Sequence, residues 1–160
     1  MTPRRPRRAA RVAVLAPDGA VLLLRSDNVE IGVHWMPPGG GIDPGETPRQ
    51  GAAREVREET GWSDVEPGEL LCTWEHDFTH QGVPVRQREH IYVTSVPERR
   101  EVPVGVVAAH AEDGILELRW WARADLLATA EQIWPPGLGK LLDGRLPGDP
   151  PVDLGFVPNR

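Results

Sequence analysis

Short apolar runs separated by turn-forming residues characterise the first part of the chain. Residues 11–26, RVAVLAPDGAVLLLRS, contain two such runs on either side of the turn sequence PDG. This pattern is typical of a β-hairpin. The polar stretch DNVEIGVH, residues 27–34, predicts a loop. WMPPGGG, residues 35–41, predicts a short extended piece followed by three flexible glycines.

A helix is predicted shortly after these glycines. Thr47 is a good N-terminal cap, and Pro48 suits the first helical position because its missing N–H has no partner there in any case. The helix is expected to end near Thr60, since Gly61 is a suitable C-terminal cap.

The rest of the chain alternates between strand-like and helix-like segments. Apolar and polar residues alternate in a second, longer hairpin and in one further strand, and two short helical pieces follow. In order, these segments are residues 69–78, 85–96, 115–122, 123–130 and 136–146. Residues between the second hairpin and the last strand show no clear period. The mixture predicts an α/β (α+β) fold in which helices cover a mixed β-sheet.

The two ends of the chain differ in composition from the rest. Residues 1–10, MTPRRPRRAA, are rich in arginine and lack the apolar core of a secretory signal, so they predict a flexible basic tail. Residues 147–160 are rich in proline and glycine and predict a loosely held C-terminal tail. The sequence therefore indicates one folded domain over residues 11–146.

The composition of the chain argues against a membrane protein, a nucleic-acid-binding protein and a disulfide-bonded protein. The 160 residues are 39% hydrophobic and 26% charged, as in soluble globular domains, and no apolar run is long enough to span a membrane. The formal net charge of −6 argues against stable nucleic-acid binding by the folded part. Cys72 is the only cysteine, so an intrachain disulfide is excluded and a reducing, cytoplasmic location is expected.

Three glutamates in the predicted helix carry the candidate chemistry. Glu55, Glu58 and Glu59 are spaced i, i+3 and i+4, so they share one helix face and repel one another. They also lie near the helix C-terminus, where the macrodipole disfavours anions. A solvated acidic face is one interpretation. The other is a site for Mg²⁺, which prefers carboxylate and phosphate oxygens, with Arg54 and Glu46 forming an ion pair beside it.

The stretch from Gly40 to Trp62, GGIDPGETPRQGAAREVREETGW, decides between these interpretations. Glu46, the sequence REVREE at residues 54–59 and Gly61 stand at the distances from Gly40 that the signature of the Nudix hydrolases has. The chain thus resembles this MutT-like family over about residues 11–145. One departure is the last position, which is usually aliphatic in the family and is Trp62 here. We expect altered packing under the helix and retained chemistry.

The resemblance implies a Nudix fold, with a mixed sheet sandwiched between helices, and a hydrolase. The implied reaction is attack of water on phosphorus in the diphosphate linkage of a nucleoside diphosphate derivative. Mg²⁺, for which Mn²⁺ substitutes, neutralises the phosphates and lowers the pKa of bound water. The expected partner is therefore this small molecule, with no stable nucleic acid and no membrane. Because family members are often homodimers, a homodimer stays open.

Roles carry over from the family position by position. Glu58 and Glu59 resemble metal ligands, and Glu55 resembles a ligand or a base that activates water. The carbonyl of Gly39 or Gly40 resembles a further ligand, because glycine lets the backbone approach closely. Arg54 and Glu46 resemble residues that orient the ligands.

Some members of the family take one more acidic residue from a late loop as base or ligand. Glu112 is our first candidate for it, and Glu117 and Glu89 are the alternatives. Trp35, Trp74 and Phe78 are candidates for stacking on a base, although core packing explains each of them as well.

Two other functions are alternatives to hydrolysis. A Nudix-fold domain can sense nucleotides without turnover, although a retired site has no reason to keep a repulsive glutamate cluster. An isomerase of isoprenoid diphosphates would need a catalytic cysteine, and Cys72, on an apolar strand, is expected in the core. No pattern in the sequence indicates which nucleotide is the substrate.

Overall fold

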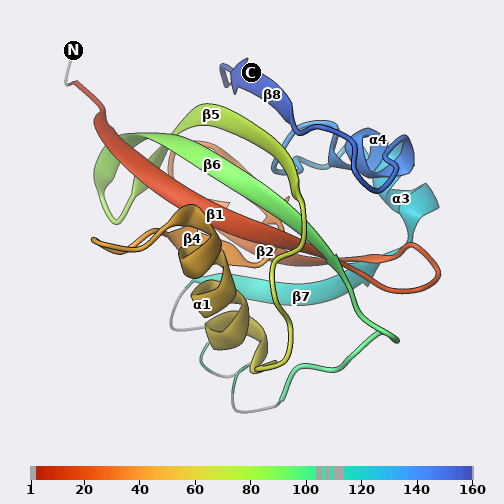
Figure 1. Cartoon of the computed structure of the whole chain (residues 1–160). Coiled ribbons are helices and arrows are strands. Elements are labelled where there is room, and N and C mark those ends of the chain that lie inside the picture. The colour runs from red at the N-terminus through yellow and green to blue at the C-terminus, as the bar shows by residue number, and fades with distance from the viewer. Residues whose placement is uncertain (1–2, 104–105, 107–108, 110–113, 160) are drawn as a thin grey trace.

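The computed structural model describes residues 3–103, 106, 109 and 114–159, and within them one mixed sheet forms the body of the molecule (Figure 1). Its strands are β1 (Arg5–Leu15), β2 (Val21–Asn28), β3 (Gly32–Met36), β4 (Gly39–Gly41), β5 (Leu70–His80), β6 (Val83–Ser95), β7 (Ile115–Trp121) and β8 (Val152–Phe156). The labelled helices are α1 (Pro48–Thr60), α3 (Arg123–Ala128) and α4 (Leu138–Asp143).

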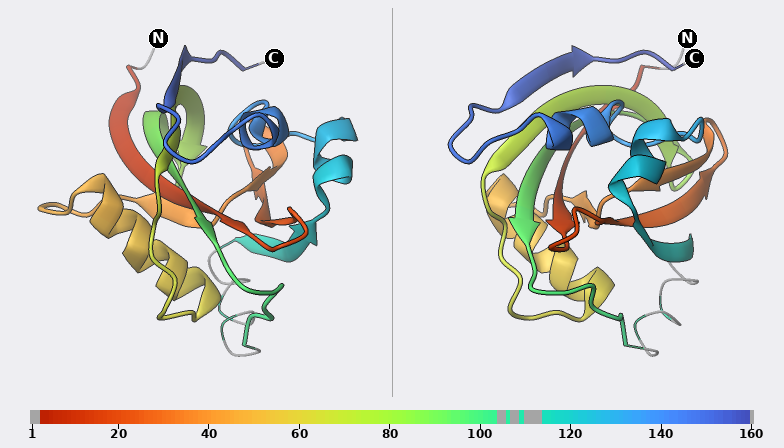
Figure 2. Two further views of the ribbon diagram at one scale, coloured as in Figure 1. Left: turned by 45° about the vertical axis from the view of Figure 1, so that its right-hand side comes forward. Right: turned by 90° about the vertical axis from the view of Figure 1, so that its right-hand side faces the viewer.

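The sheet is built around the pairing of β1 with β6. The strand order is β3-β2-β1-β6-β5-β8, with β4 also paired to β1 and β7 to β2. β1 runs parallel to β6 from Arg5, opposite Val85, to Leu15, opposite Ser95, and antiparallel to β4. Helix α1 lies on one side of the sheet, and α3 and α4 lie on the other (Figures 1 and 2). The mixed sheet sandwiched between helices is thereby confirmed.

Each face of the sheet carries its own hydrophobic core. On the α1 side, Val12 and Val14 of β1 pack with Val56 of the helix and with Trp62. Trp62 is buried, and its indole donates a hydrogen bond to the carbonyl of Glu101 (3.1 Å). The large side chain at the end of the glutamate-rich stretch is therefore accommodated in this core.

The second core, on the side of α3 and α4, is rich in tryptophan. It contains Trp35, Trp74, Trp121 and Trp134, together with Cys72. Burial raises the pKa of the Cys72 thiol to about 12, so the thiol is not ionised near neutral pH. The expectation that Cys72 is a core residue is confirmed.

Helix α1 begins and ends where the sequence predicts. The hydroxyl of Thr47 accepts a hydrogen bond from the backbone N–H of Gln50 (3.1 Å), and the Gln50 side chain accepts one from the Thr47 N–H (2.9 Å). This reciprocal pair is a capping box. Gly61 ends the helix with φ 75°, a left-handed conformation that glycine adopts without steric cost.

The N-terminal segment corrects the sequence interpretation. Strand β1 begins at Arg5, so residues 5–10 lie in the sheet and are not a loose tail. Their backbone pairs with β6, and Ala9 and Ala10 are fully buried. Composition misled here because the arginine side chains of a strand can reach polar partners or solvent while its backbone is paired within the sheet.

Two further segments carry more structure than their composition indicated. The stretch 27–34, predicted as a loop, extends β2 to Asn28 and begins β3 at Gly32. Residues 152–156, in the predicted loose C-terminus, form β8, which runs parallel to β5. Both are edge additions whose pairing depends on neighbouring strands. Within the described ranges, no helix is long and apolar enough to cross a membrane.

His34 makes the stability of this fold depend on pH. It is 3% exposed and stacks on Trp134 with ring centroids 4.1 Å apart. Burial lowers its pKa to about 4, against an ordinary value of 6.5. As the pH falls from 7 to 5, the unfolded chain takes up a proton at this residue and the folded chain does not, so stability decreases. We expect a loss of about 2 kcal/mol from this residue by linkage.

Urea unfolding at pH 7 and pH 5 measures this loss, with His34→Gln as the matched variant. The variant has no titrating group at this position, so its stability should change by about 2 kcal/mol less than that of the native chain. The other histidines are present in both chains and cancel. An equal pH dependence in the two chains would contradict the assignment.

Candidate active site

The three glutamates of α1 differ in their exposure. Glu55 is 15% exposed, whereas Glu58 is 58% exposed. Burial raises the pKa of Glu55, and the hydrogen bond and charge of Arg54 oppose this effect. Glu55 thus holds its proton more strongly than an exposed carboxyl does, which suits a group that exchanges protons with water.

Arg54 joins the helix to the preceding loop. Its Nε and Nη2 donate to the two oxygens of Glu46, at 2.8 and 2.9 Å, in a bidentate ion pair. The same Nη2 donates to the carbonyl of Gly41 (2.9 Å). The predicted Arg54–Glu46 ion pair is present, and these bonds together with the Asp43 N–H lower the pKa of Glu46 to about 2.

Arg54 also relieves the repulsion within the cluster. Its Nη1 donates to Glu55 Oε1 at 2.9 Å and to Glu58 Oε2 at 3.4 Å. The backbone N–H of Gly39 donates to Glu59 Oε2 at 3.3 Å. Each glutamate of the cluster therefore has a donor from the protein, and the bare chain tolerates three carboxylates on one helix face.

The glycines of β4 bring the backbone against these carboxylates. A Cβ atom on Gly40 would lie 2.8 Å from the carboxyl carbon of Glu55, so any other residue here would displace the Glu55 carboxylate. Because Gly40 has no side chain, its backbone can lie directly against the Glu55 carboxylate. The role of the Gly39 or Gly40 carbonyl as a metal ligand stays a prediction.

The glutamate face of α1 and the glycines of β4 line one groove, which has a volume of about 460 Å³. Glu55, Glu58, Glu59 and Gly39–Gly41 all line it. The other groups that face this groove include Arg7, Arg11, Ser26, Asp27, Asn28, His34, Phe78, His80 and Trp134. The sequence did not single out Arg7 and Arg11, although their spacing of four residues would place them on one face of a strand.

The donor set of the groove fits a hard divalent cation. Carboxylate oxygens and backbone carbonyls are the ligands of Mg²⁺ and Mn²⁺, and the space at Gly40 is one that a Cβ atom would fill. Among the described residues no three His, Cys, Asp or Glu side chains already converge as a metal site. Arg54 supplies positive charge beside Glu55 and Glu58.

The three candidates for an additional catalytic or metal-binding acidic residue differ in their exposure and in their partners. Glu112 is outside the described residues. Glu117, on β7, is 42% exposed and pairs with Arg25 at 3.3 Å. Glu89 is fully buried, with both oxygens engaged. In the described part of the chain, neither Glu117 nor Glu89 lines the groove.

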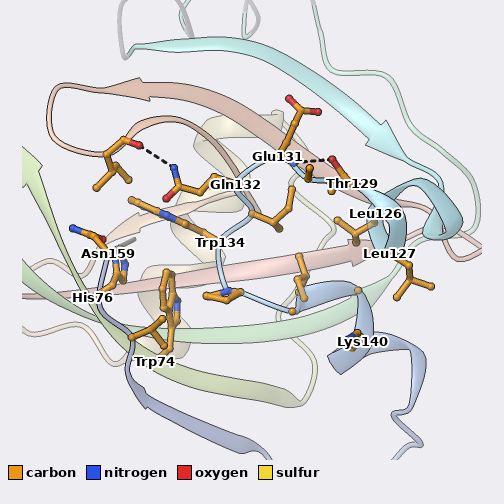
Figure 3. Close-up of a pocket in the computed structure, with 18 of the residues that line it drawn as sticks. Trp74, His76, Leu126, Leu127, Thr129, Glu131, Gln132, Trp134, Lys140 and Asn159 are labelled. Carbon is orange, nitrogen blue, oxygen red and sulfur yellow. Dashed lines mark hydrogen bonds between the residues drawn. The ribbon is translucent and has the colours of Figure 1, made fainter.

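A second, larger cavity of about 760 Å³ lies by α3 and α4 (Figure 3). Trp74, His76 and Trp134 form its aromatic wall, and none of the three glutamates lines it. Trp134 lines both cavities. Of the predicted stacking residues, Phe78 faces the groove and Trp74 faces the second cavity. Trp35 is 2% exposed in the core.

Comparison with known proteins identifies the family to which this chain belongs. The model of the NUDIX domain matches residues 5–142. An uncharacterised Nudix hydrolase of Rhodococcus erythropolis is 30% identical over 138 residues, covering 79% of this chain and 69% of that protein. A mouse bis(5'-nucleosyl)-tetraphosphatase (asymmetrical) is 51% identical over 41 residues, 26% of each chain.

Another relative is the RNA pyrophosphohydrolase of Erythrobacter litoralis, which is 45% identical over 60 residues, covering 37% of this chain and 36% of that one. The matches span only 36% of the length of the Erythrobacter protein and 26% of that of the mouse protein. Among solved structures, a NUDIX hydrolase from Nitrosomonas europaea aligns with a TM-score of 0.66 at 19% identity, covering 98% of this chain and 81% of that one. This likeness shows the fold.

Proposed function

Because the chain belongs to the NUDIX domain family, we propose that it is a metal-dependent pyrophosphohydrolase that cleaves the diphosphate linkage of a nucleoside diphosphate derivative. The observation that carries the proposal is the groove in which three glutamates of one helix face meet a strand of three glycines. Local physics disfavours such a cluster; Arg54 offsets part of the repulsion, and a cation together with a phosphate chain would offset the rest.

The side chains divide the work as follows. Glu58 and Glu59 would hold Mg²⁺ or Mn²⁺, with a carbonyl of Gly39 or Gly40 as a further donor. The bound cation would polarise phosphoryl oxygens and lower the pKa of water. Glu55, whose pKa burial raises, accepts the proton of the attacking water. Glu112 stays a candidate for this proton transfer as well.

Arg54 and Glu46 fix the geometry of this arrangement. The bidentate pair ties the loop before α1 to the helix, and the bond from Arg54 to the Gly41 carbonyl ties the helix to β4. The carboxylates of α1 and the backbone of β4 are thereby kept at a constant separation, as catalysis by positioning requires.

Substrate class is proposed from the family and from the relatives. Two relatives carry the names RNA pyrophosphohydrolase and bis(5'-nucleosyl)-tetraphosphatase (asymmetrical). Both names describe phosphate chains attached to nucleosides. Cys72, single and buried, supports a cytoplasmic location.

A panel of nucleotides tests the proposal. We expect turnover in the presence of Mg²⁺ or Mn²⁺, measured as released phosphate or pyrophosphate, and its loss on addition of a chelator. The panel should include nucleoside triphosphates, dinucleoside tetraphosphates, nucleoside diphosphate sugars and RNA with a 5'-triphosphate. Binding of these nucleotides without any turnover would instead favour a sensing domain.

A further inference from the structure

Two arginines of β1 face the groove from the side opposite the glutamates. Arg7 and Arg11 are four residues apart on one face of the strand, and both line the groove. Arg11 is 4% exposed, and Arg7 is half-buried. The domain is acidic overall, so two buried or half-buried cations in one groove are an exception to its general charge.

Buried polar residues of β6 hold these guanidinium groups from behind. Glu89 accepts from Arg11 Nε at 2.7 Å, and Gln87 accepts from Arg7 Nη1. Gln87 also donates to Glu89 at 2.7 Å, and both β6 side chains are fully buried. Burying such a network costs free energy that a hydrophobic core would not. The fold therefore fixes both cations at the groove at some cost to stability.

The glycines of β4 explain how both charges come so close to the backbone. A Cβ on Gly39 would overlap Arg11 Cγ, and one on Gly41 would lie 2.6 Å from Arg7 Nη2. Gly40, between them, faces Glu55. Strand β4 therefore has no side chains, and it separates Arg7 and Arg11 on one side from the glutamates of α1 on the other.

The two arginines differ in their direct contacts with carboxylates. Only Arg11 has a carboxylate partner, and among the described residues the hydrogen bond of Arg7 goes to the neutral amide of Gln87. Burial, and after it the charge of Arg11, lowers the pKa of Arg7, and the more distant charges of Glu89 and Glu55 oppose this effect only in part. Within the described ranges, the other four of the five N–H groups of Arg7 make no hydrogen bond and are available to an anion.

We propose that Arg7 and Arg11 form an anion subsite that binds a phosphate group adjoining the cleaved diphosphate linkage. Planar guanidinium groups match phosphate oxygens, and the groove places them across β4 from the carboxylates that would hold the cation. The preferred substrates then carry three or more consecutive phosphates. The substrate preference rests on the proposed function, whereas anion binding at Arg7 and Arg11 does not.

Direct binding tests the subsite without turnover. Tripolyphosphate and pyrophosphate are titrated into metal-free protein by calorimetry, for the native chain, Arg7→Gln and the control Arg8→Gln, whose exposed side chain neighbours Arg7. We expect Arg7→Gln to weaken tripolyphosphate binding about tenfold, as for loss of a charged hydrogen bond, and Arg8→Gln to change it less than about twofold. Equal affinities in native chain and Arg7→Gln, or no binding to the native chain, would overturn the proposal.

Kinetics then test the preference. With a nucleoside triphosphate, Arg7→Gln should lower kcat/KM about tenfold, mainly through KM, and Arg7→Lys should restore part of it. With a nucleoside diphosphate sugar the change should stay below about threefold. Equal losses on both substrates would contradict the preference. If no substrate turns over but Arg7→Gln still weakens tripolyphosphate binding, the subsite stands and the hydrolase proposal fails. Arg7 is chosen because replacing Arg11 would leave Glu89 buried without its partner.

Discussion

Replacing Glu58 or Glu59 by glutamine is expected to lower kcat by at least about 100-fold. Glutamine keeps the size of the side chain but removes the negative charge that holds a divalent cation. Glu58 is more than half exposed, so its replacement should not disturb the core. Steady-state kinetics with saturating Mg²⁺ measure the effect, and thermal unfolding checks that each variant remains folded.

Glu66→Gln is the matched control for these variants. Glu66 is exposed and lies after α1, and in the described structure it does not line the groove. Its replacement removes the same charge from the chain and should leave kcat within about twofold of the native value. Native activity in Glu58→Gln or Glu59→Gln, or an equal loss in Glu66→Gln, would refute the assignment of the metal-binding residues.

Replacing Glu89 by alanine is expected to destabilise the fold by about 3–5 kcal/mol. Its carboxylate is fully buried and accepts hydrogen bonds from Arg11, His76 and Gln87. Burial alone would raise the pKa of Glu89, but the charges of Arg11 and His76 bring it below its ordinary value. Without Glu89, Arg11 becomes a buried cation with no counter-charge. Urea unfolding at pH 7 measures the loss.

Glu117→Ala is the control for this prediction. Glu117 also pairs with an arginine, but both partners are partly exposed, so the ion pair is screened by water and should contribute no more than about 1 kcal/mol. The contrast separates a buried network from a surface ion pair with similar chemistry. Similar losses in the two variants would show that removal of Glu89 does not leave Arg11 as an uncompensated buried cation.

Local sequence patterns were sufficient where an element depends on its own residues. The capping residues Thr47 and Gly61 define α1, and the spacing of Glu55, Glu58 and Glu59 places them on one face of it, whatever the rest of the chain does. The Glu46–Arg54 pair was predictable for a similar reason, because both residues belong to one loop–helix unit. The two hairpin turns and the strand at 115–121 also follow from local alternation.

Tertiary pairing decided the features that the patterns missed. Residues 5–10 are basic in composition, and only their parallel pairing with β6, some 80 positions along the chain, makes them a strand. The same pairing places Arg7 and Arg11 in the groove and sets Glu89, an apparent candidate for a base, behind them as a buried partner. β8 likewise depends on the edge that β5 offers.

The sequence by itself determined the glutamate helix, its caps and the glycines in front of it, because hydrogen bonds and steric limits within about 20 residues specify them. Only the tertiary structure decided which remote charges meet there, because strand pairing brings Arg7 and Arg11 to the side of Gly39–Gly41 away from the glutamate helix. Charges interact through distance in space, and distances between remote segments are fixed by strand pairing and burial.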